Sequence, residues 1–149
     1  MLRHIPTTLV ERLRDDGLVI ASLVAVDDAG QVVGHILFSP VTIMPSDGGQ
    51  MQVASLAPVS VLPSHQGRGI GSMLVKHGIE VCGRARYRAI IVVGHPSYYP
   101  RFGFSHVLVS GLQNPFAADD AFMGLELSPG TVSGMEGCVV YPKAFNLFH

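Results

Sequence analysis

The sequence predicts an α/β (α+β) fold in which a mixed central sheet is flanked by helices. An apolar, strand-like run over residues 56–61 leads into a glycine-rich turn and then into a helical pattern. Residues 89–93 form a continuous apolar run, which is typical of a buried parallel strand. A strand, a helix and a second strand in this order form a right-handed crossover, and apolar runs at 18–26 and 31–39 supply a hairpin beside it.

The length and charge of the chain limit the number of domains and the kinds of partner that it can have. Its 149 residues fit one domain, 1–149, and are enough to bury a substantial core. The net charge of −1 argues against a nucleic-acid partner, because such proteins carry a basic patch or stripe. Arg3, His4 and Pro6 interrupt the N-terminus, so no secretory signal is expected, and no apolar run approaches the ~20 residues that cross a bilayer. We therefore expect a cytoplasmic protein with no membrane partner.

The cysteine and histidine residues are not spaced as in metal or redox sites. Cys82 and Cys138 each lack a second cysteine at close spacing. We expect both to be reduced, buried and apolar in character, with a disulfide as the alternative. The seven histidines show no ligand-type spacing, so no metal is expected.

The first half of the chain predicts three antiparallel strands. Residues 18–26 and 31–39 are joined by a turn at 27–30, and Pro40 and the cluster at 45–49 are expected to end the second strand and form a loop. Residues 51–61 form the third strand, which a short loop connects to the second.

A proline and a helix follow from the next stretch. Pro58 lies inside the third strand and removes a ladder donor, so we expect a bulge or a splayed strand there. The main helix is expected over residues 69–86. The apolar positions predicted to face the core are Ile70, Met73, Leu74, Val81 and Ala85.

The remaining chain carries weaker signals. Residues 96–102 form one or two helical turns, since Pro100 cannot lie deep in a helix. The strand candidates are a segment starting at Gly103 and Phe104, residues 106–112 and residues 122–127. Residues 130–145 are interpreted as a tail interrupted by glycine and proline.

The turn Gln66-Gly-Arg-Gly-Ile-Gly71 is the clearest functional signal. Glycine lets a ligand approach the backbone, and the first N–H groups of a helix have no partner within it. Together these features favour a phosphorylated ligand. The P-loop pattern is absent, and the dinucleotide fingerprint fails because Ser72 or Leu74 stands where its last glycine is required. The pattern that fits is Gln66-x-x-Gly69-x-Gly71.

This spacing resembles the acyl-coenzyme A loop of the GNAT superfamily of N-acetyltransferases. Tyr99 stands four residues before a Gly-Phe pair, which also resembles that superfamily. More narrowly, four blocks look like the YhbS-like branch of predicted N-acetyltransferases. They are Gly34-His-Ile-Leu-Phe-Ser-Pro40, Leu56-Ala-Pro-Val-Ser-Val-Leu-Pro63, Gln66-Gly-Arg-Gly-Ile-Gly71 and Tyr98-Tyr-Pro-Arg-Phe-Gly-Phe104.

The resemblance implies the GNAT-type acyl-CoA N-acyltransferase fold, whose third strand splays from its parallel neighbour. The thioester arm of coenzyme A then enters the gap, for which Pro58 gives a local reason. The pyrophosphate would meet the loop, and the pantetheine arm would pair with the strand before it. The implied coenzyme A-binding residues are Val59, Ser60, Val61, Gln66, Gly67, Arg68, Gly69, Ile70, Gly71 and Ser72.

Similar proteins usually begin with a strand and a helix that this sequence lacks or reduces. In their place, the chain predicts a short helix that Thr7 or Thr8 can cap and that ends near Asp16. This departure puts one substrate-facing wall in doubt and exposes an edge of the predicted sheet.

Acetyl transfer needs a proton donor for the leaving thiolate and a proton acceptor for the amine. Tyr99 is the candidate donor by its resemblance to the superfamily, with a packing role as the alternative. Many similar proteins place a Glu on the strand before the loop as the base, but residues 50–66 contain no Asp or Glu. His95, which follows the buried strand at the open end of the sheet, is the candidate acceptor. His35, His65 and a water chain to backbone carbonyls remain as alternatives.

The sequence therefore predicts an enzyme that moves an acetyl group from acetyl-CoA to a primary amine of a small molecule or protein. Direct attack in a ternary complex is expected, because Cys82 lies in the helix pattern without a partner to activate it as an acyl carrier. A coenzyme A-binding module without turnover is the alternative, and a general nucleotide or phosphate binder is the third. The sequence reveals neither the acceptor nor the oligomeric state, for which a homodimer is considered.

Overall fold

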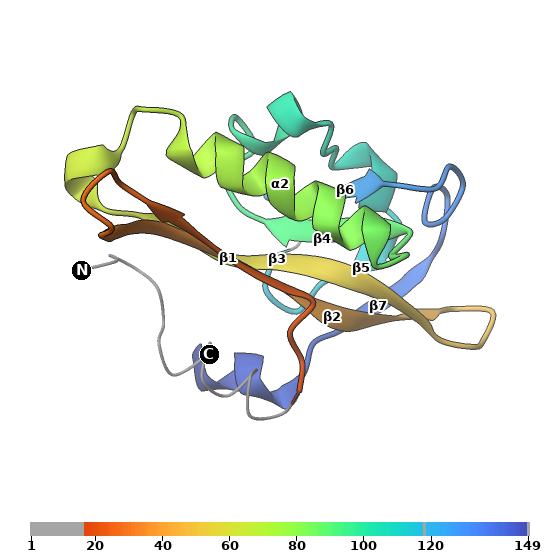
Figure 1. Ribbon diagram of the computed structural model, residues 1–149. Coiled ribbons are helices and arrows are strands. Elements are labelled where there is room, and N and C mark those ends of the chain that lie inside the picture. The colour runs from red at the N-terminus through yellow and green to blue at the C-terminus, as the bar shows by residue number, and fades with distance from the viewer. Residues whose placement is uncertain (1–16, 118, 149) are drawn as a thin grey trace.

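A computed structural model describes residues 17–117 and 119–148, and its strands form one mixed sheet (Figure 1). The strands are β1 (Ala21–Val26), β2 (Val32–Pro45), β3 (Met51–Val61), β4 (Ala89–Val93), β5 (Leu112–Gln113), β6 (Phe122–Glu126) and β7 (Gly137–Val140). Their order in the sheet is β5-β7-β2-β3-β4-β6, and β1 pairs with β2 outside this path. The predicted helix that ends near Asp16 lies outside the described residues.

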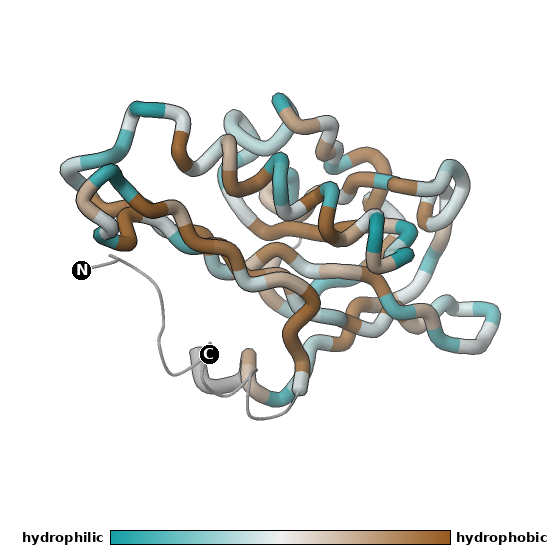
Figure 2. The backbone as a smooth tube through the Cα atoms, viewed as in Figure 1, coloured by the Kyte–Doolittle hydropathy of each residue, from teal (hydrophilic) through white to brown (hydrophobic). Residues whose placement is uncertain are grey.

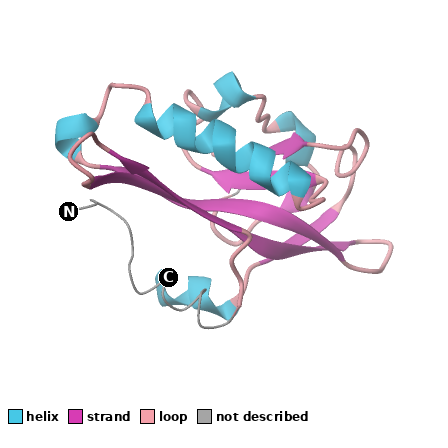
Figure 3. Ribbon diagram, viewed as in Figure 1, coloured by secondary structure: helices cyan, strands magenta, loops and turns pink. Residues whose placement is uncertain are grey.

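One long helix and several single turns surround this sheet. The helix is α2 (Ile70–Arg84), and the 3₁₀ turns are η1 (Pro63–His65), η2 (Tyr99–Phe102), η3 (Val107–Val109) and η4 (Lys143–Phe148). Helix α2 lies across one face of the sheet and η4 lies beneath the opposite face (Figures 1 and 3). Of the helices in this described part of the chain, none has both the length and the apolar character that a membrane crossing needs.

Apolar side chains fill the space on both faces of the sheet. Figure 2 shows brown, apolar backbone along the strands beneath α2. On the α2 face, Phe38 is fully buried in a cluster with Leu74 of the helix. On the other face, Leu37 packs with Ala144 and Phe145 of η4. The alternation of Leu37 and Phe38 between the two faces follows from the two-residue period of a strand.

Strand β2 is longer than the sequence predicts, because Pro40 does not end it. Pro40 pairs in register with Ala54 of β3, and β2 runs on to Pro45. On the opposite edge of β2, β1 pairs only as far as Phe38 and β7 pairs only from Thr42. Strand alternation turns the nitrogen of Pro40 toward this gap between β1 and β7. The missing N–H therefore breaks no ladder bond.

The splay expected at Pro58 is present. Strand β3 pairs with the parallel β4 only over residues 54–56, and its remaining residues continue without that neighbour. The register between β2 and β3 also shifts between Ile36 and Phe38, where β3 carries one extra residue beside Pro58. The Ala57–Pro58 peptide is cis. Bulge and splay thus occur at the proline that predicts them.

Helix α2 has the predicted position but a different buried face. Its fully buried residues are Leu74, Val75, Gly78 and Cys82. Met73 is 46% exposed, and Ala85 is exposed beyond the helix end, so both expectations were wrong. The buried face of the helix includes Gly78 instead, where an added Cβ would lie 2.0 Å from Phe38 Cε1. The ring of Phe38 occupies the place of a side chain on the helix.

The C-terminal third departs most from the predicted elements. No strand starts at Gly103 and Phe104 beyond one bridge between Ser105 and Gly124. No single strand covers residues 106–112, which contain η3 and the start of β5. Val109 of η3 packs on Gly124 of β6 and does not join a ladder. The predicted tail contains β7, which pairs with β2 from Thr42 onward. The strand predicted at 122–127 is confirmed as β6.

Candidate functional site

The glycine-rich loop joins the end of β3 to the start of α2 through η1. Gly67 and Gly69 both have φ of +79°, and Gly69 is the residue that precedes the helix. Left-handed backbone of this kind favours glycine. Nothing lies within 4 Å of a Cβ added at either position, so the space beside this backbone is open. The loop therefore presents a helix start to a ligand without side chains in the way.

Gln66, the first residue of the motif, holds the loop on the sheet. Its Nε2 donates a hydrogen bond to the carbonyl oxygen of Val61 at 3.0 Å. Sequence reasoning assigns Gln66 to ligand binding and misses this contact, because the bond depends on how η1 folds back on β3. The side chain still lines the cavity beside the loop.

Two adjoining pockets open beside this loop, and we call them together the groove. The first, of about 440 Å³, is lined by Val59, Ser60, Val61, Gln66, Gly71, His95, Tyr98 and Tyr99. The second, of about 340 Å³, is lined by Val61, His65, Gln66, Gly67, Gly69, Ile70, Gly71, Ser72, Tyr98 and Arg101. The structure thus brings together at the groove both predicted catalytic residues and all but one of the ten predicted binding residues. The exception is Arg68, which is exposed and does not line the groove.

The end of β3 offers the groove an open backbone edge. Over residues 59–61, β2 pairs with one edge of β3. Within the part of the chain that the structure describes, β4 leaves the other edge after Leu56. An extended, amide-bearing ligand arm can add to such an edge as a further strand.

Tyr99 is buried at the floor of the groove, with 6% of its surface exposed. Its ring meets Phe104 edge-on, with centroids 5.8 Å apart. A Cβ added at Gly94 would lie 2.4 Å from its Cε2, so a glycine makes room for the ring. Burial, with a smaller effect from Tyr98, raises the pKa of Tyr99 to about 12. The phenol therefore keeps its proton at neutral pH and can donate it.

Tyr98 joins the two walls of the groove. Its hydroxyl lies 3.2 Å from Ser72 Oγ in the first turn of α2. Its carbonyl accepts a hydrogen bond of 2.9 Å from Arg101 Nε, and the guanidinium carbon lies 4.5 Å from the centroid of its ring. Neither contact is predicted from the sequence, because both depend on the position of η2 over α2.

The three candidate histidines occupy different places. His95 is exposed, lines the first pocket together with Tyr99, and accepts the backbone N–H of Tyr98 at its carbonyl. His35 is buried in β2 with its Nε2 3.0 Å from Ser22 Oγ, and it lines neither pocket. His65 borders only the second pocket, 4.0 Å from Asp27. Only His95 shares a pocket with the proposed proton donor.

The two cysteines are both free thiols. Cys82 is fully buried, and burial raises its pKa to about 12, so it stays a thiol at neutral pH. Cys138 is only half-buried, which corrects the expectation that both are buried. Among residues 17–117 and 119–148, no group of three His, Cys, Asp or Glu side chains is placed to hold a metal ion.

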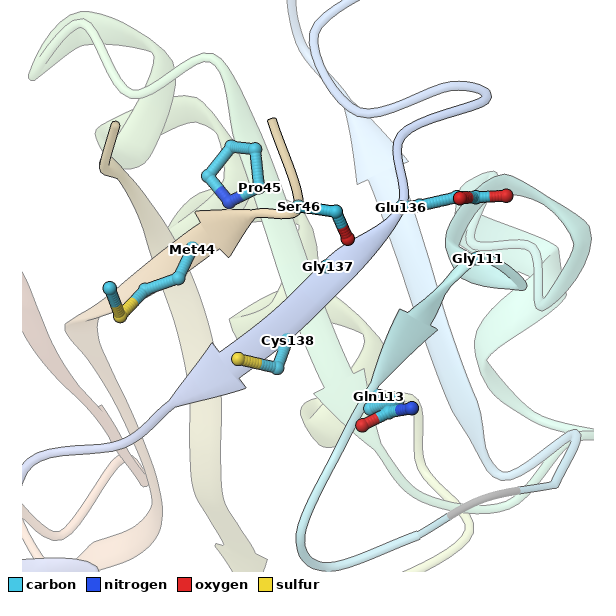
Figure 4. A pocket seen from close by; sticks show the side chains of 8 residues that line it. All are labelled: Met44, Pro45, Ser46, Gly111, Gln113, Glu136, Gly137 and Cys138. Atoms are coloured by element: carbon cyan, nitrogen blue, oxygen red, sulfur yellow. The ribbon is translucent and has the colours of Figure 1, made fainter. Parts of the chain in front are cut away.

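A larger pocket, of about 540 Å³, lies at the opposite end of β2 (Figure 4). Met44 and Ser46 line it from β2 and the turn that follows, and Gly137 and Cys138 line it from β7. It contains no residue that the sequence predicts to be functional and no helix start. Its volume therefore does not make it the candidate site.

A splayed parallel strand pair beside a glycine-rich helix start is the architecture expected of an acyltransferase. Similarity to known proteins supports the same class. Residues 4–104 match the model of the acetyltransferase (GNAT) family. The chain is 35% identical to the uncharacterized N-acetyltransferase YhbS of Escherichia coli K12 over 141 residues, which cover 94% of this chain and 83% of that protein. The chain therefore belongs to the acetyltransferase (GNAT) family, a family of N-acetyltransferases.

Two solved structures share this fold. The crystal structure of Escherichia coli YhbS in complex with CoA has a TM-score of 0.83 and 35% identity, covering 95% of this chain and 77% of that one. A GNAT family acetyltransferase from Brucella melitensis in complex with acetyl-CoA has a TM-score of 0.73 and 35% identity, covering 96% and 81%. The predicted family, fold class and N-acetyltransferase class are thereby confirmed.

Proposed function

We propose that this protein binds acetyl-CoA in the groove and transfers its acetyl group to a primary amine by direct attack in a ternary complex. The observation that carries the proposal is the groove itself, where the loop 66–72, the open edge of β3 and Tyr99 meet. The relatives solved with CoA and acetyl-CoA support this choice of ligand. The diphosphate lies at the helix start and the pantetheine arm adds to β3.

In the proposed reaction, the neutral amine nitrogen attacks the carbonyl carbon of the thioester. A C–N bond forms, the C–S bond breaks, and the sulfur leaves with the electron pair. The Tyr99 phenol, which is protonated at neutral pH, supplies the proton that the thiolate takes. The amine must lose a proton, and His95 accepts it, because it is the histidine that shares the Tyr99 pocket. The buried thiol of Cys82 takes no part, which favours one direct step.

The acceptor is a primary amine of a small molecule or of a protein. Among the described residues, the groove wall formed by 59–61 carries no carboxylate, so the base of many similar proteins is replaced. The same observation favours a second candidate, a coenzyme A-binding protein without turnover.

Release of free thiol from acetyl-CoA, measured with a panel of amines, separates these two functions. Amine-dependent release supports the enzyme, and its absence with every amine supports the binding protein. Thermal unfolding with CoA, ATP or NAD tests the ligand itself. A ligand at 100 times its Kd adds roughly 2.7 kcal/mol, so stabilisation by CoA alone is expected. Equal stabilisation by ATP and NAD would contradict the proposed ligand.

A further inference from the structure

The side of the groove opposite the glycine-rich loop carries a cation that the sequence motif does not contain. Arg101 belongs to η2 and lines the same pocket as Gly67, Gly69 and Ser72. Arg68, which lies within the loop and is the motif's own cation, does not line this pocket. The loop supplies N–H donors from one wall, and the guanidinium supplies a charge from the other.

Arg101 is held in place by two contacts with Tyr98. Its Nε–H donates to the Tyr98 carbonyl at 2.9 Å, and its guanidinium carbon lies 4.5 Å from the ring centroid. This use of Nε leaves four N–H donors on the two Nη groups, in the planar fork that matches phosphate oxygens. Tyr98 is itself tied to Ser72 of α2. Arg101, Tyr98 and Ser72 therefore form a connected bridge across the groove.

We propose that Arg101 is a phosphate clamp that pairs with the diphosphate of coenzyme A from the wall opposite the loop. This inference rests on the proposed function. The diphosphate is favoured over the 3′-phosphate because Arg101 shares its pocket with the helix start, where the diphosphate binds. Ion pairing there also fixes η2, the turn that carries Tyr99. Arg101 is thus a binding residue that positions the proton donor.

The test measures the Kd of CoA, dephospho-CoA and pantetheine for the wild type and for Arg101→Gln. Loss of a charge-assisted bidentate contact raises Kd about 10- to 100-fold. The rise should be equal for CoA and dephospho-CoA, which both contain the diphosphate, and absent for pantetheine, which contains no phosphate. Arg101→Lys keeps the charge without the fork and should lie between the two proteins. Arg84→Gln, at the far end of α2, is the matched control and should match the wild type.

Each other result overturns the clamp. An unchanged Kd shows that Arg101 does not contact the ligand. A rise for CoA alone assigns the contact to the 3′-phosphate, and an equal rise for all three ligands indicates a structural effect through Tyr98. Wild-type protein that binds no CoA defeats the proposed function, which is a distinct result. In turnover, Arg101→Gln should raise KM for acetyl-CoA more than it lowers kcat, and the affinity of the wild type should fall more steeply with salt than that of the variant.

Discussion

The two ends of β2 and β3 present their backbones differently. At the groove, β3 has β2 on one edge over residues 59–61, and β4 has left its other edge. At the pocket of Figure 4, β2 pairs with β7 over residues 42–45 and with β3 as far as Ile43. The second end has the larger single pocket, yet β7, which lines it, is paired on both edges, with β2 and with β5.

This difference explains why volume is a poor guide to the site. A ligand with phosphates and amides needs donors that the protein has not already used. The helix start at Gly69 and the edge of β3 that β4 leaves after Leu56 supply such donors at the groove. Mutations that distinguish the two ends therefore test the assignment.

The largest effect is expected for Gly69→Val. The variant places a branched side chain where the phosphate must approach and at a φ of +79° that valine rarely adopts. We expect loss of CoA binding, by more than about 100-fold in Kd, in a protein that still folds. Calorimetric titration measures the loss, and circular dichroism checks the fold.

Gly130→Val is the matched control at the other end. Gly130 has φ of +80°, nothing lies within 4 Å of an added Cβ, and the residue lines a pocket beside Glu136. The backbone strain is therefore the same as at Gly69, so the cost in stability should be similar. Unchanged CoA affinity in Gly69→Val, or equal loss in both variants, would remove the groove as the binding site.

Tyr99→Phe should have the next largest effect, and on rate alone. The change keeps the ring and removes the proton donor, so kcat and kcat/KM should fall together by about 10²–10⁴-fold. The Kd of CoA should hardly change. Steady-state kinetics and titration, run beside Tyr98→Phe, provide the measurement.

Comparison with Tyr98→Phe shows whether Tyr99 is the wrong proton donor or whether no tyrosine donates the proton. Tyr98→Phe loses the contact with Ser72 Oγ and should act mainly on cofactor affinity. A normal rate in Tyr99→Phe with a collapsed rate in Tyr98→Phe would keep the mechanism and change the residue. Normal rates in both would reject a tyrosine acid.

The parts of the fold that the sequence predicts well are those with local causes. The bounds of β3 and β4 agree with the predicted residues 51–61 and 89–93, because proline, glycine and continuous apolar runs limit them. Pro40 was misread because only the gap between β1 and β7 makes a proline acceptable in β2. Strand β7 was missed for a related reason, since its four residues form a strand by pairing with β2 and β5, which lie far from it in the sequence.

The site likewise has parts with local causes and parts that depend on contacts between distant segments. The loop and Tyr99 were predicted from spacing, because a helix start and a short turn are encoded locally, and the structure places both beside the groove. The bridge from Arg101 through Tyr98 to Ser72 was not found, since it needs η2 to fold over α2. Nor was the buried face of α2, where the ring of Phe38 fills the space at Gly78.

Stability at alkaline pH depends on three largely buried groups, Cys82 in the helix, Tyr99 in the groove and Tyr141 on the opposite face of the sheet. Burial raises the pKa of Cys82 from 9.0 to about 12, and those of Tyr99 and Tyr141 from 10.0 to about 12. The unfolded chain releases these protons first, so the stabilisation is complete below pH 9 and is lost as the pH rises toward 12. Each group contributes a slope of about 1.4 kcal/mol per pH unit.

Denaturant unfolding between pH 8 and 11 measures this loss. Of these three groups, Cys82 has the lowest pKa in the unfolded chain and is the first to lose its proton there as the pH rises. Cys82→Ala should therefore be less stable at pH 8 but should lose less stability than the wild type between pH 8 and 10, with turnover nearly unchanged. A flat wild type over that interval would contradict the buried thiol, and ping-pong kinetics that vanish in Cys82→Ala would contradict direct attack.

The smallest effect is expected for Tyr141→Phe. This variant should lose stability and keep its rate, whereas Tyr99→Phe should lose rate. Asn114 Nδ2 donates to the Tyr141 hydroxyl at 2.8 Å, and the ring packs on Phe116 and Phe145. Phenylalanine keeps the packing and loses one partly buried hydrogen bond, which costs about 1 kcal/mol. Tyr141 packs with Leu37 and Phe145, whereas Tyr99 of the groove packs in the cluster beneath α2, so kcat should not change. In a double-mutant cycle with Asn114→Ala, the two losses should be less than additive, because both remove the same bond. A drop in kcat without loss of stability would mean that this face of the sheet is coupled to the groove, and that the catalytic machinery is not confined to the groove.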